Sequence, residues 1–357
     1  MPARLLTPSS IWNSFRSSHK KHLILTGGRR TGKTTLLSTL FPENSEGITT
    51  WAIPGECVFL KENKTKRTVW VGTFDGTAQG KENKMRPCRE GFLGLGITAL
   101  RSCMESEEEW ITIDEIGYLE TECPEYCEAL LQLMEKKRVA AVVRKQELPF
   151  LRSLCERSDV FLVDLDDPFG KIACVIMASG MGKRFGGNKL MADFHGQPMI
   201  LRAIEATEGI FEKRVAVTRH ADVDELCRAH GIESVLHDQP YRSDTVRLGI
   251  EAVGDAEACV FCPGDQPMLR KETVVSLALA AKNHPDDIWR VCFEETPGAP
   301  VLFPKWTFAE LSSLPEGKGG GFLAKKYPER VRTVSARDRF ELMDTDTPED
   351  LEFLQKL

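Results

Sequence analysis

The sequence lacks any apolar run approaching the ~20 residues that a helix needs to cross a membrane. Its first residues, MPARLLTPSSIWNSF, also lack the apolar core of a secretory signal peptide. The 11 cysteines are odd in number and scattered along the chain, which argues against a disulfide framework. We therefore expect a cytoplasmic protein that works without a membrane.

An excess of positive charge is also missing. The formal net charge is −6, so there is no overall reason to expect binding to nucleic acid. Nucleotides would have to be held by local lysines, arginines and metal ions. At 357 residues, with 41% hydrophobic and 28% charged residues, the chain is long for a single core, and two globular domains are expected.

Strand and helix patterns alternate along the first half. Strands are expected at His22–Thr26, Trp110–Ile113, Val139–Arg144 and Val160–Leu165, and helices at Thr31–Leu40, Pro124–Lys136 and Glu147–Glu156. This alternation is typical of a mostly parallel sheet with helices on both faces, a three-layer α/β domain. The intervening segments Trp51–Leu60 and Thr68–Phe74 predict a hairpin.

Charges, a proline and a glycine interrupt the apolar runs at Asp164–Gly170. Beyond them the alternation restarts, which indicates a second α/β unit with its own core. Strands are expected at Ile172–Ala178, Arg214–Thr218, Ile232–Leu236, Ala258–Cys262 and Ile288–Phe293, and helices at Met199–Thr207, Val223–His230, Thr245–Val253, Lys271–Lys282 and Pro348–Lys356. We therefore predict domains at residues 1–167 and 171–357.

A glycine-rich loop with the sequence GGRRTGKT, Gly27–Thr34, lies between the first strand and the first helix. Its glycines allow backbone N–H groups to surround a phosphate, and the helix N-terminus adds positive potential. Lys33 would bind the β- and γ-phosphates, and the Thr34 hydroxyl would bind Mg²⁺. The expected nucleotide-binding residues are Gly27, Gly28, Arg30, Thr31, Gly32, Lys33, Thr34 and Thr35.

The strand that begins at Trp110 ends in the acidic pair Asp114-Glu115. In a phosphate-hydrolysing site, such a pair places Asp114 beside Mg²⁺ and Glu115 beside the attacking water, where it acts as the catalytic carboxylate. A helix cap or a surface charge is the alternative role for a carboxylate at a strand end.

These residues resemble the small P-loop nucleoside triphosphatases first known from hyperthermophiles, whose signature strand ends in Asp-Glu-Ile-Gly. The resemblance covers GGRRTGKTT, the hairpin, DEIG and the later strands of the first half. It implies slow, Mg²⁺-dependent hydrolysis of ATP or GTP, and phosphorylation of a small acceptor is a further possibility.

A second glycine-rich loop, Ala178–Lys189, follows the first strand of the second half. Nucleotidyl transfer joins an already ionised phosphate to a triphosphate, so alignment and charge neutralisation matter more than a general base. Gly180 and Gly182 would allow close backbone approach. The cations Lys183, Arg184 and Lys189 would meet the phosphates.

Asp265 comes soon after the expected strand Ala258–Cys262. Gly264 precedes it, and Pro267 follows two residues later. Its restricted backbone suits a Mg²⁺ ligand, because this ion demands strict octahedral geometry. An ordinary Gly-Asp turn is the alternative reading.

The second half resembles the molybdenum-cofactor nucleotidyltransferases, nearest the cytidylyltransferase branch, through ASGMGKRFGGNKLM, FHGQPMI, SDTVRLGI, PGDQP, GAPVLF, GKGGG and DTDTPEDL. The resemblance implies a Rossmann-like, GT-A-like α/β domain that uses CTP and Mg²⁺. The residues it places at the nucleotide are Ala178, Ser179, Gly180, Gly182, Lys183, Arg184, Lys189, Ser243, Asp244, Thr245 and Asp346, and those at the metal are Asp265 and Asp344. Asp346 also suits a helix N-terminus.

Relatives usually carry Ala-Ala-Gly or Ala-Gly-Gly where this chain has Ala178-Ser179-Gly180, so the choice between CTP and GTP stays open. Together the two resemblances predict a bifunctional enzyme. The second domain would transfer CMP from CTP to molybdopterin for a molybdenum hydroxylase client, and the first would hydrolyse ATP or GTP. The alternatives are a guanylyl- or sugar-nucleotide transferase, and a nucleotide-binding switch or small-molecule kinase in the first domain.

Overall fold

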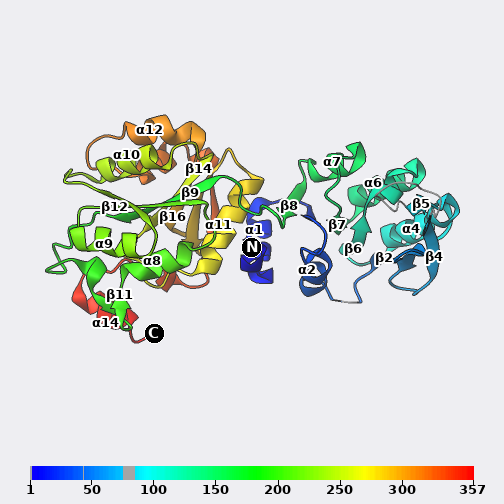
Figure 1. The fold of residues 1–357 in the computed structure, drawn as a ribbon, viewed down its shortest axis with the longest axis horizontal. Coiled ribbons are helices and arrows are strands. Elements are labelled where there is room, and N and C mark those ends of the chain that lie inside the picture. Colours follow the sequence, from blue (N-terminus) through cyan, green and yellow to red (C-terminus); the bar gives the residue numbers. More distant parts are fainter. Residues whose placement is uncertain (1, 43, 75–84) are drawn as a thin grey trace. The chain divides into compact units, whose positions relative to one another are not determined.

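A computed structural model describes residues 2–42, 44–74 and 85–357. The chain forms two compact units (Figure 1), which are treated separately below. The first contains His19–Pro168, and the second contains Pro2–Ser18 together with Phe169–Leu357. No helix in the described ranges has both the length and the apolar character of a membrane span.

The first unit is built on an eight-stranded sheet in the order β5-β4-β3-β2-β6-β7-β1-β8. Its strands are β1 (His22–Thr26), β2 (Gly47–Ile53), β3 (Cys57–Glu62), β4 (Thr68–Phe74), β5 (Met85–Pro87), β6 (Trp110–Ile116), β7 (Arg138–Val143) and β8 (Val160–Asp164). Strands β2, β6, β7, β1 and β8 run parallel, and β3, β4 and β5 extend the sheet in antiparallel fashion. The carboxyl ends of β6, β7, β1 and β8 therefore meet at one edge.

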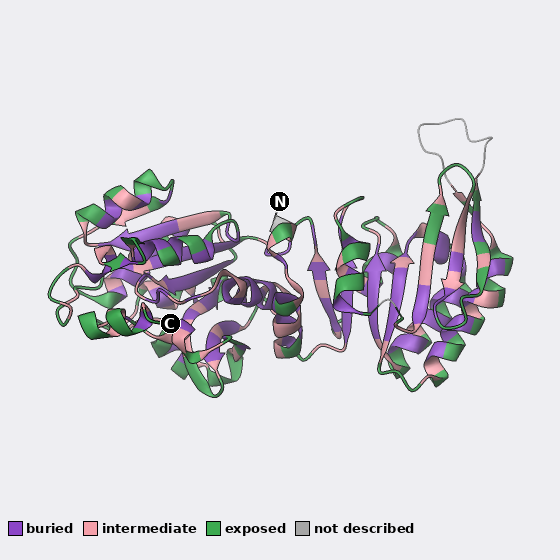
Figure 2. Ribbon diagram, turned by 90° about the horizontal axis from the view of Figure 1, so that it is seen from below, coloured by how far each residue is buried: buried purple, intermediate pink, exposed green. Residues whose placement is uncertain are grey.

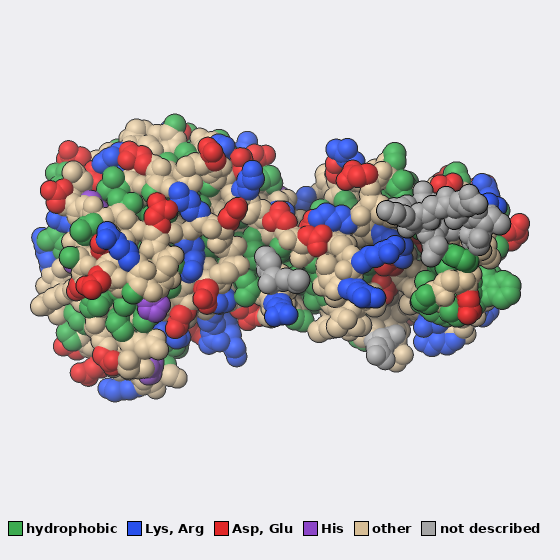
Figure 3. Space-filling model, in the orientation of Figure 1, with side chains coloured by type: hydrophobic (Ala, Val, Ile, Leu, Met, Phe, Trp, Pro, Cys, Tyr) green, Lys and Arg blue, Asp and Glu red, His purple; other side chains and the backbone are tan. Residues whose placement is uncertain are grey.

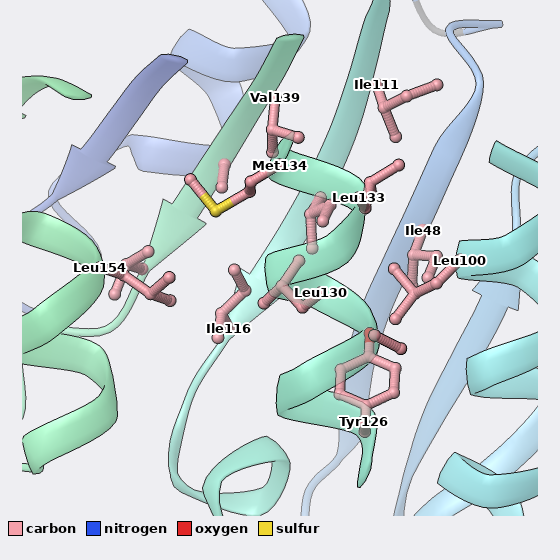
Figure 4. Close-up of a cluster of buried hydrophobic side chains, with 14 of the residues drawn as sticks. Ile48, Leu100, Ile111, Ile116, Tyr126, Leu130, Leu133, Met134, Val139 and Leu154 are labelled. Atoms are coloured by element: carbon pink, nitrogen blue, oxygen red, sulfur yellow. The ribbon is translucent and has the colours of Figure 1, made fainter. Parts of the chain in front are cut away.

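Helices cover this sheet because each has one apolar stripe. The helical elements are α2 (Lys33–Leu40), α3 (Arg89–Gly91), the π-helix η2 (Phe92–Gly96), α4 (Ile97–Glu105), α5 (Tyr118–Thr121), α6 (Pro124–Lys136) and α7 (Pro149–Cys155). In α6, proline occupies the first turn, and Tyr126, Leu130 and Leu133 recur at helical spacing and are buried. Figure 4 shows these side chains packed against Ile48 of β2 and Ile111 of β6.

The predicted hairpin contains one strand more than the sequence suggested. Trp51–Leu60 was expected to be continuous, but β2 ends at Ile53 and β3 begins at Cys57. The turn between them contains Pro54 and Gly55, and Gly55 has a φ of 78°. Proline followed by glycine at positive φ is a strong turn signal. The apolar residues on both sides of the turn made Trp51–Leu60 resemble one continuous strand in the sequence.

The second unit contains a seven-stranded sheet in the order β13-β12-β9-β14-β16-β15-β17. Its strands are β9 (Ile172–Ala178), β12 (Lys213–Thr218), β13 (Glu233–Leu236), β14 (Ala258–Pro263), β15 (Ile288–Phe293), β16 (Thr296–Pro304) and β17 (Val331–Ser335), and β10 (Asp193–Phe194) and β11 (Gln197–Pro198) form a separate ribbon. Strands β13, β12, β9 and β14 are parallel, and β16 is antiparallel to both its neighbours.

Helices cover both faces of the second sheet. They are α1 (Pro8–Ser18), α8 (Ile200–Thr207), α9 (Ala221–Ala229), α10 (Arg242–Val253), α11 (Lys271–Asn283), α12 (Phe308–Ser312), α13 (Gly321–Lys326) and α14 (Pro348–Leu354). Figure 2 shows the strands as mostly buried and the outer sides of the surface helices as exposed. In contrast to a surface helix, α11 is buried at every residue from Thr273 to Ala281, so it is covered on more than one side.

The N-terminal helix α1 supplies the additional cover for α11. The first expected domain included residues 2–18, but in the structure α1 packs against α11 and β17 of the second unit. Thr7 caps α1 by accepting a hydrogen bond from the Ser10 N–H, and Ile11 and Phe15 are buried. The apolar face of α1 thus completes the second core, and residues 19–168 form an insertion in the chain of the second unit.

We predict that Phe15→Ala destabilises the second unit by about 3–5 kcal/mol, because it removes a buried ring from the contact with α11. Hydrogen exchange followed by mass spectrometry should show faster exchange in α11 and unchanged exchange in α6. Phe92→Ala, which removes a buried ring from the first unit, should give the reverse pattern. Faster exchange in α6 of the Phe15 variant would contradict the assignment of α1.

Candidate functional sites

The first site is formed where β1 ends and α2 begins. The connecting loop contains Gly27 and Gly32 with φ angles of 141° and 93°, which L side chains rarely adopt. Lys33 follows, and its Nζ donates to the carbonyl oxygens of Gly27 at 3.0 Å and Gly28 at 2.5 Å. Burial lowers the pKa of Lys33, and the nearby Asp166 carboxylate opposes this shift. A triphosphate would replace the two carbonyls as the partner of this ammonium group.

Asp114 lies beside the start of α2. The Thr34 hydroxyl donates to Asp114 Oδ1 at 3.2 Å, and burial raises the pKa of Asp114 while Thr34 and Lys33 oppose that shift. Hard oxygen donors of this kind fit Mg²⁺. Within the described ranges no group of three or more His, Cys, Asp or Glu side chains could hold a metal, so this ion would take its other ligands from phosphate and water.

Glu115 is fixed from two directions. Its N–H donates to the Thr50 hydroxyl of β2 at 2.9 Å, and this hydroxyl donates to the Glu115 carbonyl at 3.2 Å. Its carboxylate forms an ion pair with Arg144. The sheet order explains the contact, because β7, which Arg144 follows, lies between β6 and β1.

The role of Arg144 in the first site was not predicted. Burial lowers the pKa of its guanidinium group, and the charge of Arg29 acts in the same direction. Placed beside Glu115, this cation can orient the carboxylate and face developing negative charge on a phosphate. The sequence shows that Arg144 directly follows a buried strand, β7. It does not show that β7 lies in the sheet between β1, which leads into the phosphate loop, and β6, which carries Asp114 and Glu115.

Asp166 is a second residue at this site that sequence reasoning missed. The Gly28 N–H donates to Asp166 Oδ2 at 2.9 Å, and Lys145 Nζ donates to Asp166 Oδ2 at 3.0 Å and to Asp164 Oδ2 at 2.8 Å. The segment that follows β8 therefore holds the beginning of the phosphate loop. Lys145 lowers the pKa of Asp166, which keeps this carboxylate ionised.

The second site is centred on Lys189, just beyond the loop that follows β9. Its Nζ lies 2.6 Å from Asp265 Oδ2 and 3.1 Å from Asp346 Oδ1, and its side chain is only 7% exposed. Arg184 Nη2 lies 2.6 Å from Asp346 Oδ2. A pocket of about 310 Å³ is lined by Gly180, Met181, Gly182, Lys183, Arg184, Lys189 and Asp346.

The loop can form this pocket because it folds back on itself at Gly182. This residue has a φ of 56°, and a Cβ atom there would lie 2.2 Å from the carbonyl oxygen of Gly187. A substitution would therefore both strain the backbone and force the loop apart. Gly180 lies close to the Lys189 side chain, because a Cβ atom added to Gly180 would lie 3.9 Å from Cε of Lys189.

Two carboxylates contact Lys189, those of Asp265 and Asp346, and Asp344 lies in the same segment as Asp346. Asp265 follows β14, and its carbonyl oxygen accepts a hydrogen bond from the Thr345 N–H at 2.9 Å, which ties the two segments together. Gln266 Nε2 donates to Asp344 Oδ1 at 2.9 Å. The pKa of Asp344 is raised by burial and then by the charge of Asp265. A divalent cation would relieve this repulsion, so the oxygen donors here fit one.

Asp346 is not the cap of the C-terminal helix α14. Thr347, not Asp346, caps α14, since its hydroxyl accepts a hydrogen bond from the Asp350 N–H at 3.2 Å. The Asp346 carboxylate points instead to Arg184 and Lys189. At the start of α10, Ser243 and Thr245 are buried, and Asp244 accepts a hydrogen bond from the Tyr241 N–H at 3.1 Å.

His237 is a residue of the second unit that the sequence did not single out. It follows β13, and its Nε2 lies 2.8 Å from the hydroxyl of Ser179 in the loop. This hydroxyl donates its only hydrogen to the Val217 carbonyl at 3.0 Å, so the imidazole must donate to it. Burial, followed by the charge of Arg219, lowers the pKa of His237 and favours the neutral ring. Ser179 is left with acceptor capacity only.

Family models match both units. Residues 22–168 match the NTPase family, and residues 174–331 match the MobA-like NTP transferase domain. The chain is thus a fusion of an NTPase domain with a MobA-like NTP transferase domain, and the predictions of this fusion and of its fold class are confirmed.

Each of the following three proteins resembles this chain over only part of its length, and at 34% sequence identity or less. The 3-deoxy-manno-octulosonate cytidylyltransferase of Neisseria meningitidis serogroup C is 34% identical in an alignment of 96 residues that covers 24% of this chain. The chain spans about a third, 36%, of that relative. Rv0371c from Mycobacterium tuberculosis H37Rv has 21% identity and a TM-score of 0.47, covering 52% of this chain and 99% of its own. THEP1 from Aquifex aeolicus has 19% identity and a TM-score of 0.35, covering 40% and 89%.

We predict that Arg144→Ala lowers the rate of nucleoside triphosphate hydrolysis on the order of 10²-fold, because a positioned cation beside the phosphate is lost. Phosphate release under saturating nucleotide measures the effect. Arg138→Ala is the matched control, since Arg138 begins the same strand at its opposite end. Equal rates in wild type and Arg144→Ala would remove this arginine from the site.

Proposed function

We propose that the second unit transfers CMP from CTP to the terminal phosphate of molybdopterin and releases pyrophosphate. The observation that carries this proposal is the buried Lys189 held between Asp265 and Asp346, beside a pocket lined by Gly180, Gly182 and the cations Lys183 and Arg184. The MobA-like family of the domain supports the transferase class. The choice of molybdopterin as the acceptor rests on the resemblance of the motifs in the second half to those of the molybdenum-cofactor nucleotidyltransferases.

The chemistry suits the residues present. The acceptor phosphate is already an anion, so its oxygen can attack the α-phosphate of CTP without a general base, and the bond to the pyrophosphate leaving group breaks. Arg184 and Lys189 neutralise charge that moves onto the phosphates. Mg²⁺, when bound, would supply Lewis-acid stabilisation of the phosphate oxygens, and Asp265 and Asp344 would hold it.

A second candidate function has a specific observation behind it. The curated relative from Neisseria meningitidis is named as a cytidylyltransferase that acts on 3-deoxy-manno-octulosonate. An acidic sugar is therefore the alternative acceptor for the same donor nucleotide. The two functions share CTP and pyrophosphate and differ only in the acceptor, so a direct comparison of acceptors separates them.

We infer that the first unit hydrolyses ATP or GTP. Lys33 would hold the β- and γ-phosphates, Thr34 and Asp114 would hold Mg²⁺, and Glu115 would orient the attacking water. A nucleotide-binding switch or a small-molecule kinase is the alternative for this unit. We place both reactions in the cytoplasm, with a molybdenum hydroxylase as the client of the cytidylylated cofactor.

Pyrophosphate release from CTP tests the transferase. We predict release with molybdopterin and Mg²⁺, and no release when 3-deoxy-manno-octulosonate replaces molybdopterin. Asp265→Asn keeps the size of the side chain but removes its charge, and should reduce the rate on the order of 10²-fold without affecting nucleotide hydrolysis. Lys33→Ala should do the opposite. Release with the sugar acid alone would replace the proposed acceptor, and loss of both activities in either variant would contradict two separate sites.

Base selection provides a further prediction. Because the Ser179 hydroxyl offers acceptor capacity only, it can accept a hydrogen bond from the amino group of cytosine but meets only an oxygen in uracil. Ser179→Ala should therefore reduce the preference for CTP over UTP by about tenfold, the worth of one hydrogen bond. The ratio of kcat/KM for the two nucleotides measures this effect. An unchanged ratio in Ser179→Ala would rule out this contact.

A further inference from the structure

Three aromatic side chains form a row across the antiparallel part of the first sheet. Trp51 of β2 is paired directly with Phe59 of β3, which is paired directly with Trp70 of β4. The rings of Trp51 and Phe59 are stacked with centroids 5.3 Å apart, and Phe59 meets Trp70 edge-on at 6.3 Å. Trp51 is 40% exposed and Trp70 is 59% exposed. We call these three residues the aromatic row.

The row lies on the face of the sheet opposite to α4. Ile48, Leu60 and Val71, each an odd number of positions from a member of the row, belong to the buried core that includes Leu100 of α4. Since side chains alternate between the faces of a strand, the row points the other way. In Figure 3, hydrophobic side chains are visible at the surface near the part of the unit where Figure 1 labels β4.

The backbone behind the row is firmly supported. A Cβ atom on Gly91 of α3 would lie 1.9 Å from the carbonyl oxygen of Trp70, so this helix touches the strand itself. The Cys88 N–H also donates to the Val71 carbonyl at 2.9 Å. The exposed rings therefore stand on a rigid base, and little order has to be gained when something binds to them.

The row is close to the first nucleotide site. Trp51 follows Thr50, whose hydroxyl bonds to both the N–H and the carbonyl of Glu115. Strand β2 pairs with β6 on the side away from the phosphate loop. A molecule on the row would thus lie beyond Glu115, on the side of the site opposite to β1.

Positive charge accompanies the rings. Lys61 lies two residues after Phe59 on the same face, and its Nζ is 6.0 Å from the centre of the Trp51 ring. Lys61 has no ion-pair partner among the residues that the structure describes. Stacked aromatic surface beside a lysine complements a flat ring that carries negative charge.

Cross-strand aromatic pairs also stabilise hairpins, and that effect alone explains rings that cover one another. It does not explain why the outermost tryptophan, Trp70, keeps 59% of its surface in water. Nor does it account for a lysine that lies over the Trp51 ring and has no ion-pair partner among the residues that the structure describes. A ligand explains both observations.

We propose that the aromatic row and Lys61 form a binding site for a small heteroaromatic compound that carries a phosphate. The ring of this compound lies against the exposed surfaces of Trp51 and Trp70, and its phosphate lies near Lys61. The site goes beyond hydrolysis of nucleoside triphosphates, because it is separate from the phosphate loop and gives the first unit a second ligand. The row is too short to hold more than one or two rings, which favours a small molecule over a nucleic acid strand.

Tryptophan fluorescence tests the proposal on the full chain. The probes are neopterin monophosphate and GMP, with neopterin and guanosine as their uncharged counterparts and oligo(dT) of increasing length as the nucleic acid. We expect both phosphorylated probes to quench fluorescence and to bind equally well to Lys33→Ala, which separates this site from the phosphate loop. Trp51→Ala/Trp70→Ala also lacks the two fluorophores, so its affinity is measured by calorimetry. It should bind the probes at least about tenfold more weakly than wild type.

Three further variants make the test specific. Trp51→Phe/Trp70→Phe keeps the rings and should retain most of the affinity, measured by calorimetry because the fluorophores are gone. Lys61→Met should weaken the phosphorylated probes about threefold and leave the uncharged ones unchanged. Trp306→Ala, which removes a tryptophan that is 42% exposed in the second unit, should not alter affinity.

Several outcomes would overturn the proposal. Unchanged affinity in the double alanine variant would remove the row from the site. Affinity for oligo(dT) that rises with length would indicate nucleic acid, and a change in oligomeric state of the double variant without probe binding would indicate a second copy of the chain. Phosphate release by wild type and by the double variant is a separate readout, so failure of this site is distinguishable from failure of the proposed hydrolysis.

Discussion

Each unit depends on one electrostatic constraint, which is the presence of a lysine with reduced access to water at a glycine-rich turn. Lys33 is held by two loop carbonyls, and Lys189 is held by Asp265 and Asp346. A buried ammonium group is costly unless it is paired, so each fold must supply oxygen partners. In the first unit these partners are neutral carbonyls of the glycine-rich loop, and in the second they are carboxylates of two other segments.

The parallel strands of each sheet bring the residues of each site together. Their carboxyl ends meet at one edge, so side chains that are distant in the sequence come together there. In this way Thr34 meets Asp114 and Arg144 meets Glu115 in the first unit. In the second unit Lys189, just beyond the loop after β9, meets Asp265 after β14. The aromatic row lies instead on the neighbouring strands β2, β3 and β4.

The helix α1 shows how packing overrules the order of the chain. Its eleven residues precede the phosphate loop, yet Ile11 and Phe15 are buried against the second unit. An apolar helical face is stable only where it can be covered, and α11 offers a matching surface. The NTPase domain is consequently joined to the transferase domain by two chain connections, at residues 18–19 and 168–169.

The sequence by itself determined the local chemistry. Glycine spacing, the strand-end acids and the apolar periods of helices such as α6 depend on neighbours within a few residues, so both loops and the family of each domain could be read directly. The tertiary structure decided which distant residues join them. Arg144, Asp166 and His237 carry no motif, and they matter because sheet order and loop packing place them beside Glu115, Gly28 and Ser179. The sequence also did not show the turn at Pro54-Gly55 or the unit to which α1 belongs. Apolar residues near these segments indicate burial, but they do not indicate which surface covers them.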